Sequence, residues 1–126
     1  MQIQWTAWVT IAALAVYLWT ICIVSLARGK YKVKAPSVDG PPEFLRAMRV
    51  QVNTVEQIIV FLPALWMCAV LLGDRWAALG GAIWVLGRII YALAYYRDPA
   101  KRSVGFMITL LATLGLIAGT ALGLLR

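Results

Sequence analysis

Four long apolar stretches divide the chain. They run over about residues 3–27, 44–72, 76–96 and 103–125, and the first and last contain no charged residue. Because about 20 apolar residues in a helix cross the hydrocarbon core of a bilayer, each stretch is long enough to span a membrane. The pattern predicts an all-α fold, an integral membrane four-helix bundle.

Helix-breaking and polar residues separate these stretches. Residues 28–43 form a basic segment that ends in Gly40-Pro41-Pro42, residues 73–75 form a tight turn, and residues 97–102 form a short polar loop. Proline and glycine in such clusters interrupt a helix. The first stretch lacks a basic start and a small-residue cleavage site, so we interpret it as a retained helix and not as a signal peptide.

Composition supports a membrane protein and narrows its chemistry. The 126 residues are 63% apolar and 13% charged, with a mean hydropathy of +0.82, and they fit one domain over 1–126. There is no histidine, and the two cysteines, Cys22 and Cys68, both lie in apolar runs. We therefore expect neither a disulfide framework nor a metal site.

The formal net charge of +7 is unevenly distributed. Seven basic residues lie in the two loops that share one side of a four-span chain: Arg28, Lys30, Lys32, Lys34, Arg97, Lys101 and Arg102. The other side has Arg75 and Arg126. By the positive-inside rule, the basic loops are cytoplasmic and both termini lie outside. The charge is thus a topology signal, and no nucleic-acid partner is expected.

Polar residues also occur inside the spans. Arg46, Arg49, Asn53 and Glu56 follow one another at spacings of three, four and three, which places them on one helix face. In the third span, Arg88, Tyr91 and Tyr95 form a second stripe. A charge in a span costs at least about 2.5–3.5 kcal/mol, so each needs a partner. The two stripes overlap in depth, and we expect them to face each other. We expect Glu56 to be buried, within salt-bridge or hydrogen-bond reach of the third span or of a ligand.

Two interpretations of these stripes remain open. A buried Glu56–Arg88 ion pair would only hold the helices together, although such pairs seldom give a net gain. Alternatively, the stripes bind an anionic, zwitterionic, peptide-like ligand: the arginines take its carboxylates and Glu56 or Asn53 takes an ammonium or amide, while lipid delivers an apolar second substrate. Without histidine the chain has no Ser-His or Cys-His pair, so the ligand would supply the reactive atom. An arginine beside a thiol stabilises the thiolate.

Several motifs together resemble the MAPEG superfamily, the membrane-associated proteins in eicosanoid and glutathione metabolism, in its bacterial type. They are Gly40-Pro41-Pro42-Glu43-Phe44, Arg46-x-x-Arg49-x-Gln51-x-Asn53-x-x-Glu56, Phe61-Leu62-Pro63 and Arg88-x-x-Tyr91-x-x-x-Tyr95. The resemblance covers nearly the whole chain. It implies a homotrimer, in a bacterial inner membrane, that holds glutathione as a co-substrate between neighbouring subunits near the cytoplasmic face.

The resemblance also implies roles for individual residues. The positions that match the family's glutathione-binding residues within one subunit are Arg49, Asn53, Glu56, Arg88, Tyr91 and Tyr95. Arg28 and Gln51 match contacts from the adjacent subunit. Gly29 stands where relatives have a second arginine, and Lys30 is the candidate to replace it. Arg102 matches the arginine beside the glutathione sulfur, and Ser103 follows it. Gln57 and Phe106 replace tyrosines found in branches of the family.

Three functions are compatible with these features. The first is a membrane-embedded glutathione-dependent transferase or peroxidase that acts on lipophilic electrophiles. The second is a non-catalytic membrane protein that binds lipid or glutathione. The third is a small multidrug/proton exporter, but the essential acid of that class lies in its first helix, and residues 3–27 contain no acid.

Overall fold

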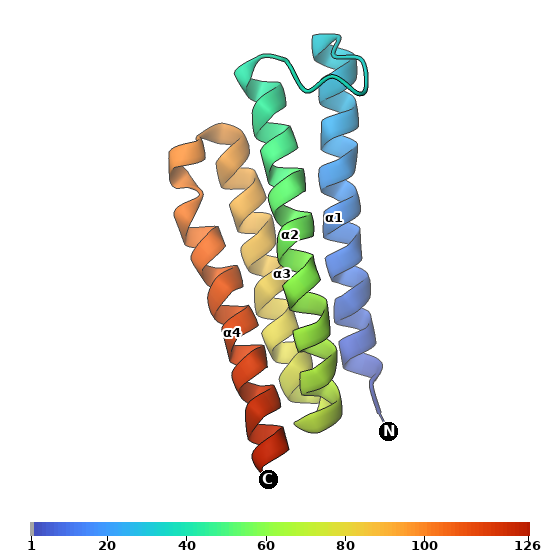
Figure 1. Ribbon diagram of the computed structural model, residues 1–126, viewed down its shortest axis with the longest axis vertical. Coiled ribbons are helices and arrows are strands. Elements are labelled where there is room, and N and C mark those ends of the chain that lie inside the picture. The colour runs from blue at the N-terminus through green and yellow to red at the C-terminus, as the bar shows by residue number, and fades with distance from the viewer. Residues whose placement is uncertain (1) are drawn as a thin grey trace.

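The computed structural model describes residues 2–126 as four long helices and one short 3₁₀ helix (Figure 1). The helices are α1 (Gln4–Tyr31), α2 (Pro42–Leu71), α3 (Asp74–Arg97), η1 (Pro99–Lys101) and α4 (Ser103–Leu125). The all-α fold with four spans is therefore confirmed. All four helices are long and apolar enough to cross a membrane, so the protein is an integral membrane protein.

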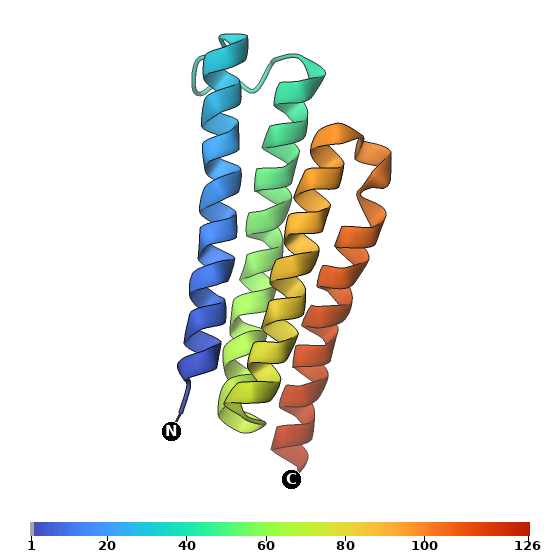
Figure 2. The ribbon, with the colours of Figure 1, turned by 180° about the vertical axis from the view of Figure 1, so that it is seen from behind.

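The long helices alternate in direction and lie side by side (Figures 1 and 2). Both termini and the α2–α3 turn lie at one end, named here the termini end. The α1–α2 loop and the α3–α4 connection lie at the opposite end, named the loop end. α2 and α3 pack against each other and against both α1 and α4. The two polar stripes of the sequence thus fall on the two central helices.

Close packing between α3 and α4 fixes where α4 begins. A Cβ atom at Gly105 would collide with the backbone nitrogen of Tyr91, and one at Gly87 would meet the Ile108 side chain. Only glycine permits this approach at position 105. This approach holds Tyr91 and the first turn of α4 against each other. Farther along the bundle, Phe61 of α2 stacks on Trp84 of α3, with ring centroids 4.1 Å apart.

α1 is longer than its apolar stretch indicates. It continues through residues 28–31, which we expected to belong to the basic loop. Nothing in Arg28-Gly29-Lys30-Tyr31 breaks a helix, and Arg28 and Lys30 suit the last turn because cations there oppose the partial negative charge of the helix end. The helix stops at Lys32, which has a left-handed conformation with φ of 57°. Arg28 therefore belongs to the helix and not to the loop.

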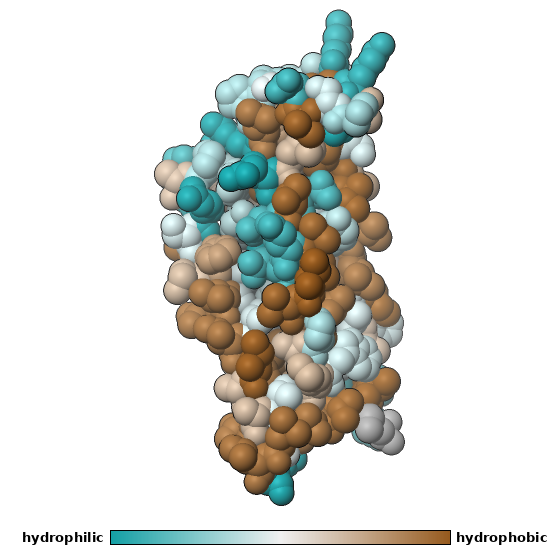
Figure 3. All heavy atoms as spheres, in the orientation of Figure 1, coloured by the Kyte–Doolittle hydropathy of each residue, from teal (hydrophilic) through white to brown (hydrophobic). Residues whose placement is uncertain are grey.

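The surface is mostly apolar, as a surface in contact with lipid should be (Figure 3). Large apolar side chains are exposed along all four helices, among them Leu18, Ile59, Leu86 and Leu111. Hydrophilic residues gather at the loop end, and one hydrophilic area extends from there over α2 and α4 into the apolar surface (Figure 3). Such an intrusion of polar groups is where a functional site is expected.

Candidate functional site

A hollow of about 510 Å³ lies toward the loop end between α2, α3 and the start of α4. We name it the polar hollow. Its lining residues are Arg49, Val52, Asn53, Glu56, Tyr91, Tyr95 and Arg102. All but Val52 had been predicted from the sequence, and their polar groups make the hollow hydrophilic. Its volume is in the range of small-molecule sites, about 300–1,000 Å³.

The helical spacing explains why these residues meet. Arg49, Asn53 and Glu56 recur every three or four residues on α2, and Tyr91 and Tyr95 recur on α3. Since α2 starts at the loop end and α3 finishes there, both sets reach the same depth. Arg102 then enters from the short connection before α4. The expectation that the two stripes face each other at one depth is therefore confirmed.

Arg88 does not line the polar hollow but lies behind it. Its side chain is fully buried, and Nη2 donates a hydrogen bond to Asn53 Oδ1 over 2.6 Å. Its guanidinium carbon lies 3.8 Å from the centre of the Tyr91 ring. Nε and Nη1 have no partner among residues 2–126. Arg88 therefore contacts two residues that line the hollow, and it orients the Asn53 amide so that the NH₂ group is free for a ligand.

Glu56 differs from its predicted state. Its side chain is exposed in the single chain, where we expected a buried and paired carboxylate. Arg88 is bonded to Asn53, one turn of α2 nearer the loop end, instead of to Glu56. The interpretation of a Glu56–Arg88 ion pair that only clips the helices together is thus wrong. An exposed carboxylate on the wall of the hollow remains available to a cationic group.

A second, smaller hollow adjoins the polar one. It has about 400 Å³ and is lined by Asn53, Tyr91, Arg102, Ser103, Phe106 and Met107. We name it the adjoining hollow. Three of these residues, Asn53, Tyr91 and Arg102, line both hollows. Val52 and Met107 were missed by the sequence argument, because an apolar residue in a span carries no signal that separates it from a lipid-facing one.

Arg102 and Ser103 stand where the two hollows meet the start of α4. Arg102 is exposed, and its Nη1 donates to the Pro99 carbonyl over 2.8 Å. No side chain caps the first turn of α4, so its backbone N–H groups remain open. Free amides and a guanidinium together favour a negative charge at this point.

Three other predicted site residues lie elsewhere. Arg28 donates to the Ser37 carbonyl over 2.7 Å and lies over the Phe44 ring, so it supports the α1–α2 loop. Gln51 donates to Tyr17 Oη over 3.1 Å, on the side of α2 that faces α1. Lys30 is exposed beside Tyr31. None of the three lines either hollow of its own chain.

The fold and the hollow together define a class: a four-helix integral membrane protein whose apolar surface is interrupted by a polar hollow with two arginines. The sequence profile of the MAPEG family matches residues 6–122. The chain therefore belongs to the MAPEG family, and the resemblance drawn from its motifs is confirmed. This membership speaks against the small multidrug/proton exporter.

Named relatives support the same assignment. The chain is 42% identical to an uncharacterized protein of Synechocystis sp., over 98% of this chain and 90% of the other. It is 40% identical to microsomal glutathione S-transferase 2 of Homo sapiens, over 74% of this chain and 69% of that protein. It is 32% identical to leukotriene C4 synthase of Mus musculus, over 98% and 83% of the respective chains. These relatives place the chain in a family of glutathione-utilising membrane enzymes.

Proposed function

We propose that the protein is a membrane-embedded glutathione transferase that joins glutathione to lipophilic electrophiles. The observation that carries the proposal is the convergence of Arg49, Asn53, Glu56, Tyr91, Tyr95 and Arg102 on one hollow of about 510 Å³. Glutathione has two carboxylates, one ammonium group, two amides and a thiol. A hollow with two arginines, one carboxylate and neutral hydrogen-bonding groups is complementary to that set.

Each group of the ligand has a suitable partner in the polar hollow. The Arg49 fork binds a carboxylate, and the exposed Glu56 carboxylate takes the ammonium group. The free NH₂ of Asn53 donates to a peptide carbonyl, since Arg88 already occupies its oxygen. Tyr91 and Tyr95 close the wall from α3. This arrangement leaves the thiol to lie toward Arg102.

Arg102 and the open first turn of α4 stabilise the thiolate in this scheme. The thiolate sulfur attacks an electrophilic carbon, a sulfur–carbon bond forms, and a leaving group or an opening ring takes the displaced electron pair. Ser103 is within the adjoining hollow to donate a hydrogen bond to that group. Phe106 and Met107 give the same hollow an apolar side for the electrophile. Such electrostatic stabilisation is often the largest single catalytic contribution.

The same thiolate would serve a peroxidase. It attacks the terminal oxygen of a lipid hydroperoxide, a sulfur–oxygen bond forms as the oxygen–oxygen bond breaks, and the alkoxide takes a proton and leaves as the alcohol. The thiol of a second glutathione then attacks the resulting sulfenic acid, which gives the disulfide and water. Conjugation and peroxide reduction both need the same bound thiolate. We therefore treat them as one proposal, and each reaction has its own assay.

The proposal includes a homotrimer in a bacterial inner membrane, with the loop end cytoplasmic and both termini outside. Arg28, Lys30 and Gln51 lie outside the hollows of their own chain, and the polar hollow is open on the side of Glu56. In a symmetric assembly, these residues of one subunit complete the hollow of the next. The proposed homotrimer is supported by the family resemblance and by the incomplete site of the single chain.

The decisive experiment is glutathione binding by the purified protein in detergent, measured by calorimetry, followed by the ultraviolet absorbance of the bound thiolate. Turnover is then measured with a generic electrophile and with a lipid hydroperoxide. Binding, thiolate and turnover together are the expected result. Binding without thiolate and without turnover would instead favour the non-catalytic binding protein.

A further inference from the structure

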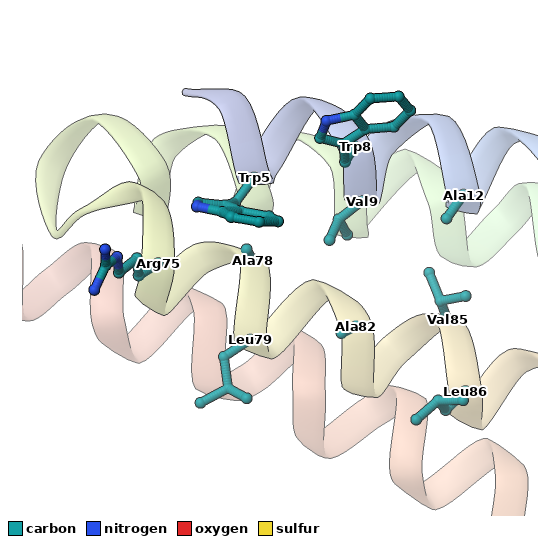
Figure 4. Close-up of a pocket in the computed structure, with 10 residues that line it drawn as sticks. All are labelled: Trp5, Trp8, Val9, Ala12, Arg75, Ala78, Leu79, Ala82, Val85 and Leu86. Atoms are coloured by element: carbon teal, nitrogen blue, oxygen red, sulfur yellow. The ribbon is translucent and has the colours of Figure 1, made fainter. Parts of the chain in front are cut away.

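A second large hollow lies away from the polar one. A groove of about 660 Å³ lies between α1 and α3 at the termini end (Figure 4). We name it the α1–α3 groove. Its floor is made of small side chains, including Ala12, Ala78 and Ala82, and its flanks are made of apolar ones such as Val85 and Leu86. No residue of the proposed glutathione site lines it.

The mouth of the groove, at the termini end, has an arginine and a tryptophan. Arg75 lies there on the first turn of α3, and the Trp5 ring lies near it over the gap between α1 and α3 (Figure 4). Arg75, Trp5 and Trp8 are exposed. Exposed tryptophans at a helix end are typical of the level of lipid headgroups. An exposed arginine at that level meets lipid phosphates directly.

The carboxylate next to this arginine is engaged by α1. Asp74 accepts hydrogen bonds from the backbone nitrogens of Trp5, over 3.1 Å, and Thr6, over 2.8 Å. It also accepts from Thr6 Oγ1 over 2.7 Å. Asp74 thus caps the start of α1, whose partial positive charge it balances. The same contacts hold α1 against α3 at the mouth, so the groove is preformed.

The length of the groove matches the hydrocarbon thickness of one leaflet of a bilayer. From Arg75 to Leu86 the α3 axis rises by about 16 Å at 1.5 Å per residue, about half of a hydrocarbon core of about 30 Å. Farther along the same pair of helices, a second apolar hollow of about 350 Å³ is lined by Val16, Trp19, Ile89 and Leu93. An acyl chain that enters at Arg75 therefore has apolar contacts beyond the middle of the bilayer.

We propose that the α1–α3 groove is a binding site for one anionic phospholipid of the leaflet at the termini end, with an acyl chain along Ala78 and Ala82 and the phosphate on Arg75. The other basic residue at this end, Arg126, already donates to the Leu72 carbonyl over 3.2 Å. The site stands apart from the glutathione proposal, since it lies at the opposite end of the bundle.

The test compares lipid retention by native mass spectrometry of the delipidated protein. The probes are phosphatidylglycerol and phosphatidylcholine with the same palmitoyl and oleoyl chains. We expect the wild type to retain phosphatidylglycerol about fivefold better, because its headgroup is anionic whereas the choline cation cancels the phosphate charge of phosphatidylcholine. Arg75→Gln should abolish this preference, whereas Arg126→Gln, the matched control for charge, should keep it.

A second pair of variants tests the groove itself. Ala82→Phe fills the floor and should reduce retention of both lipids severalfold, while Ala118→Phe, at an exposed alanine of α4, should not. Equal retention of the two lipids by the wild type, or unchanged retention in Arg75→Gln or Ala82→Phe, overturns the proposal. A change of oligomeric state in Ala82→Phe, with folding intact, also overturns it, because the groove is then a contact between copies. Glutathione binding is not affected by any of these outcomes.

Discussion

At the scale of single residues, Arg88 and Arg102 show two different uses of an arginine in a membrane protein. Arg88 is fully buried with one hydrogen bond, to Asn53, and two nitrogens without partners in the described chain. Arg102 is exposed, and it lines both hollows. In the proposed site, the buried arginine positions other groups, whereas the exposed one meets the ligand. The sequence placed both on the site but did not separate these roles, because burial depends on how α2 and α3 pack.

The first prediction concerns Arg102. Arg102→Ala should lower the conjugation rate by about tenfold to a thousandfold, the range for loss of one electrostatic stabiliser, and leave glutathione affinity within a fewfold. The pKa of the bound thiol should rise toward about 8.5, the value of a free thiol. Thiolate absorbance against pH and steady-state kinetics measure the two effects. Lys101→Ala, at an exposed neighbouring charge, is the control. Equal conjugation rates in the two variants would show that Arg102 only helps to set the orientation of the chain in the membrane.

The second prediction concerns Arg88 as a positioning residue. Arg88→Met should weaken glutathione binding by about tenfold to a hundredfold, because a hydrogen bond to a charged group contributes about 1.5–3 kcal/mol and Asn53 loses its orientation. Asn53→Ala should have a similar effect. The double variant should be little worse than either single one, since both changes disrupt one contact. Calorimetry measures all three affinities. Additive losses would instead show that Arg88 and Asn53 act independently.

At the scale of elements, the four helices were predictable because apolar length alone decides a membrane span. The ends of the helices were less so. α1 gains residues 28–31 because charged residues are tolerated where a helix leaves the membrane. That α2 and α3 face each other followed from the spacing of their polar residues. Whether Glu56 is buried or exposed did not follow, since it depends on which neighbour covers that face of α2, and the sequence of one chain does not contain that information.

The third prediction concerns the contact of α4 with α3. Gly105→Ala places a methyl group against the Tyr91 backbone and must push the start of α4 outward. The free energy of unfolding should fall by about 1–3 kcal/mol, and glutathione binding should weaken because Arg102 and Tyr91 separate. Gly115→Ala is a matched control on the same helix, because a Cβ atom there meets nothing within 4 Å. Thermal unfolding in detergent and calorimetry compare them. Equal effects of the two changes would contradict the packing argument.

The fourth prediction concerns the cap that joins α3 to α1. Asp74→Ala removes an acceptor of three hydrogen bonds from Trp5 and Thr6. We expect a loss of about 1–2 kcal/mol in the free energy of unfolding, the effect of losing a helix N-cap. Asp39→Ala, in the exposed loop, should be nearly neutral. Because the cap lies at the termini end, glutathione affinity at 25 °C should not change. A loss of affinity equal to that of Gly105→Ala would show that the two ends are coupled.

At the scale of the whole molecule, the polar hollow and the apolar α1–α3 groove of the single chain lie at opposite ends of the bundle and on different faces. The polar hollow opens on the faces of α2 and α4, and the α1–α3 groove opens on another face at the other end. Residues that the family resemblance assigns to the same glutathione molecule, such as Arg49 and Gln51, face different sides of one chain. Sequence comparison could propose this set, but only the proposed assembly of several copies would bring its members together.

The proposed trimer predicts that two defective subunits can restore each other. Arg49→Ala removes a ligand from the polar hollow, and Arg28→Ala removes one that a neighbour supplies, so each variant alone should bind glutathione weakly. In trimers assembled from equal amounts of both, about a quarter of the subunit contacts join an intact Arg49 to an intact Arg28. Calorimetry of co-expressed, doubly tagged protein should therefore recover about a quarter of the wild-type number of tight sites. Native mass spectrometry checks that each variant alone and the mixture are trimeric, so that a folding defect is not mistaken for a lost ligand. The shared site would be refuted if Arg28→Ala alone bound glutathione normally, since Arg28 lies outside the hollow of its own chain. It would also be refuted if the mixture bound no better than the two variants do separately, since both arginines would then act within one chain.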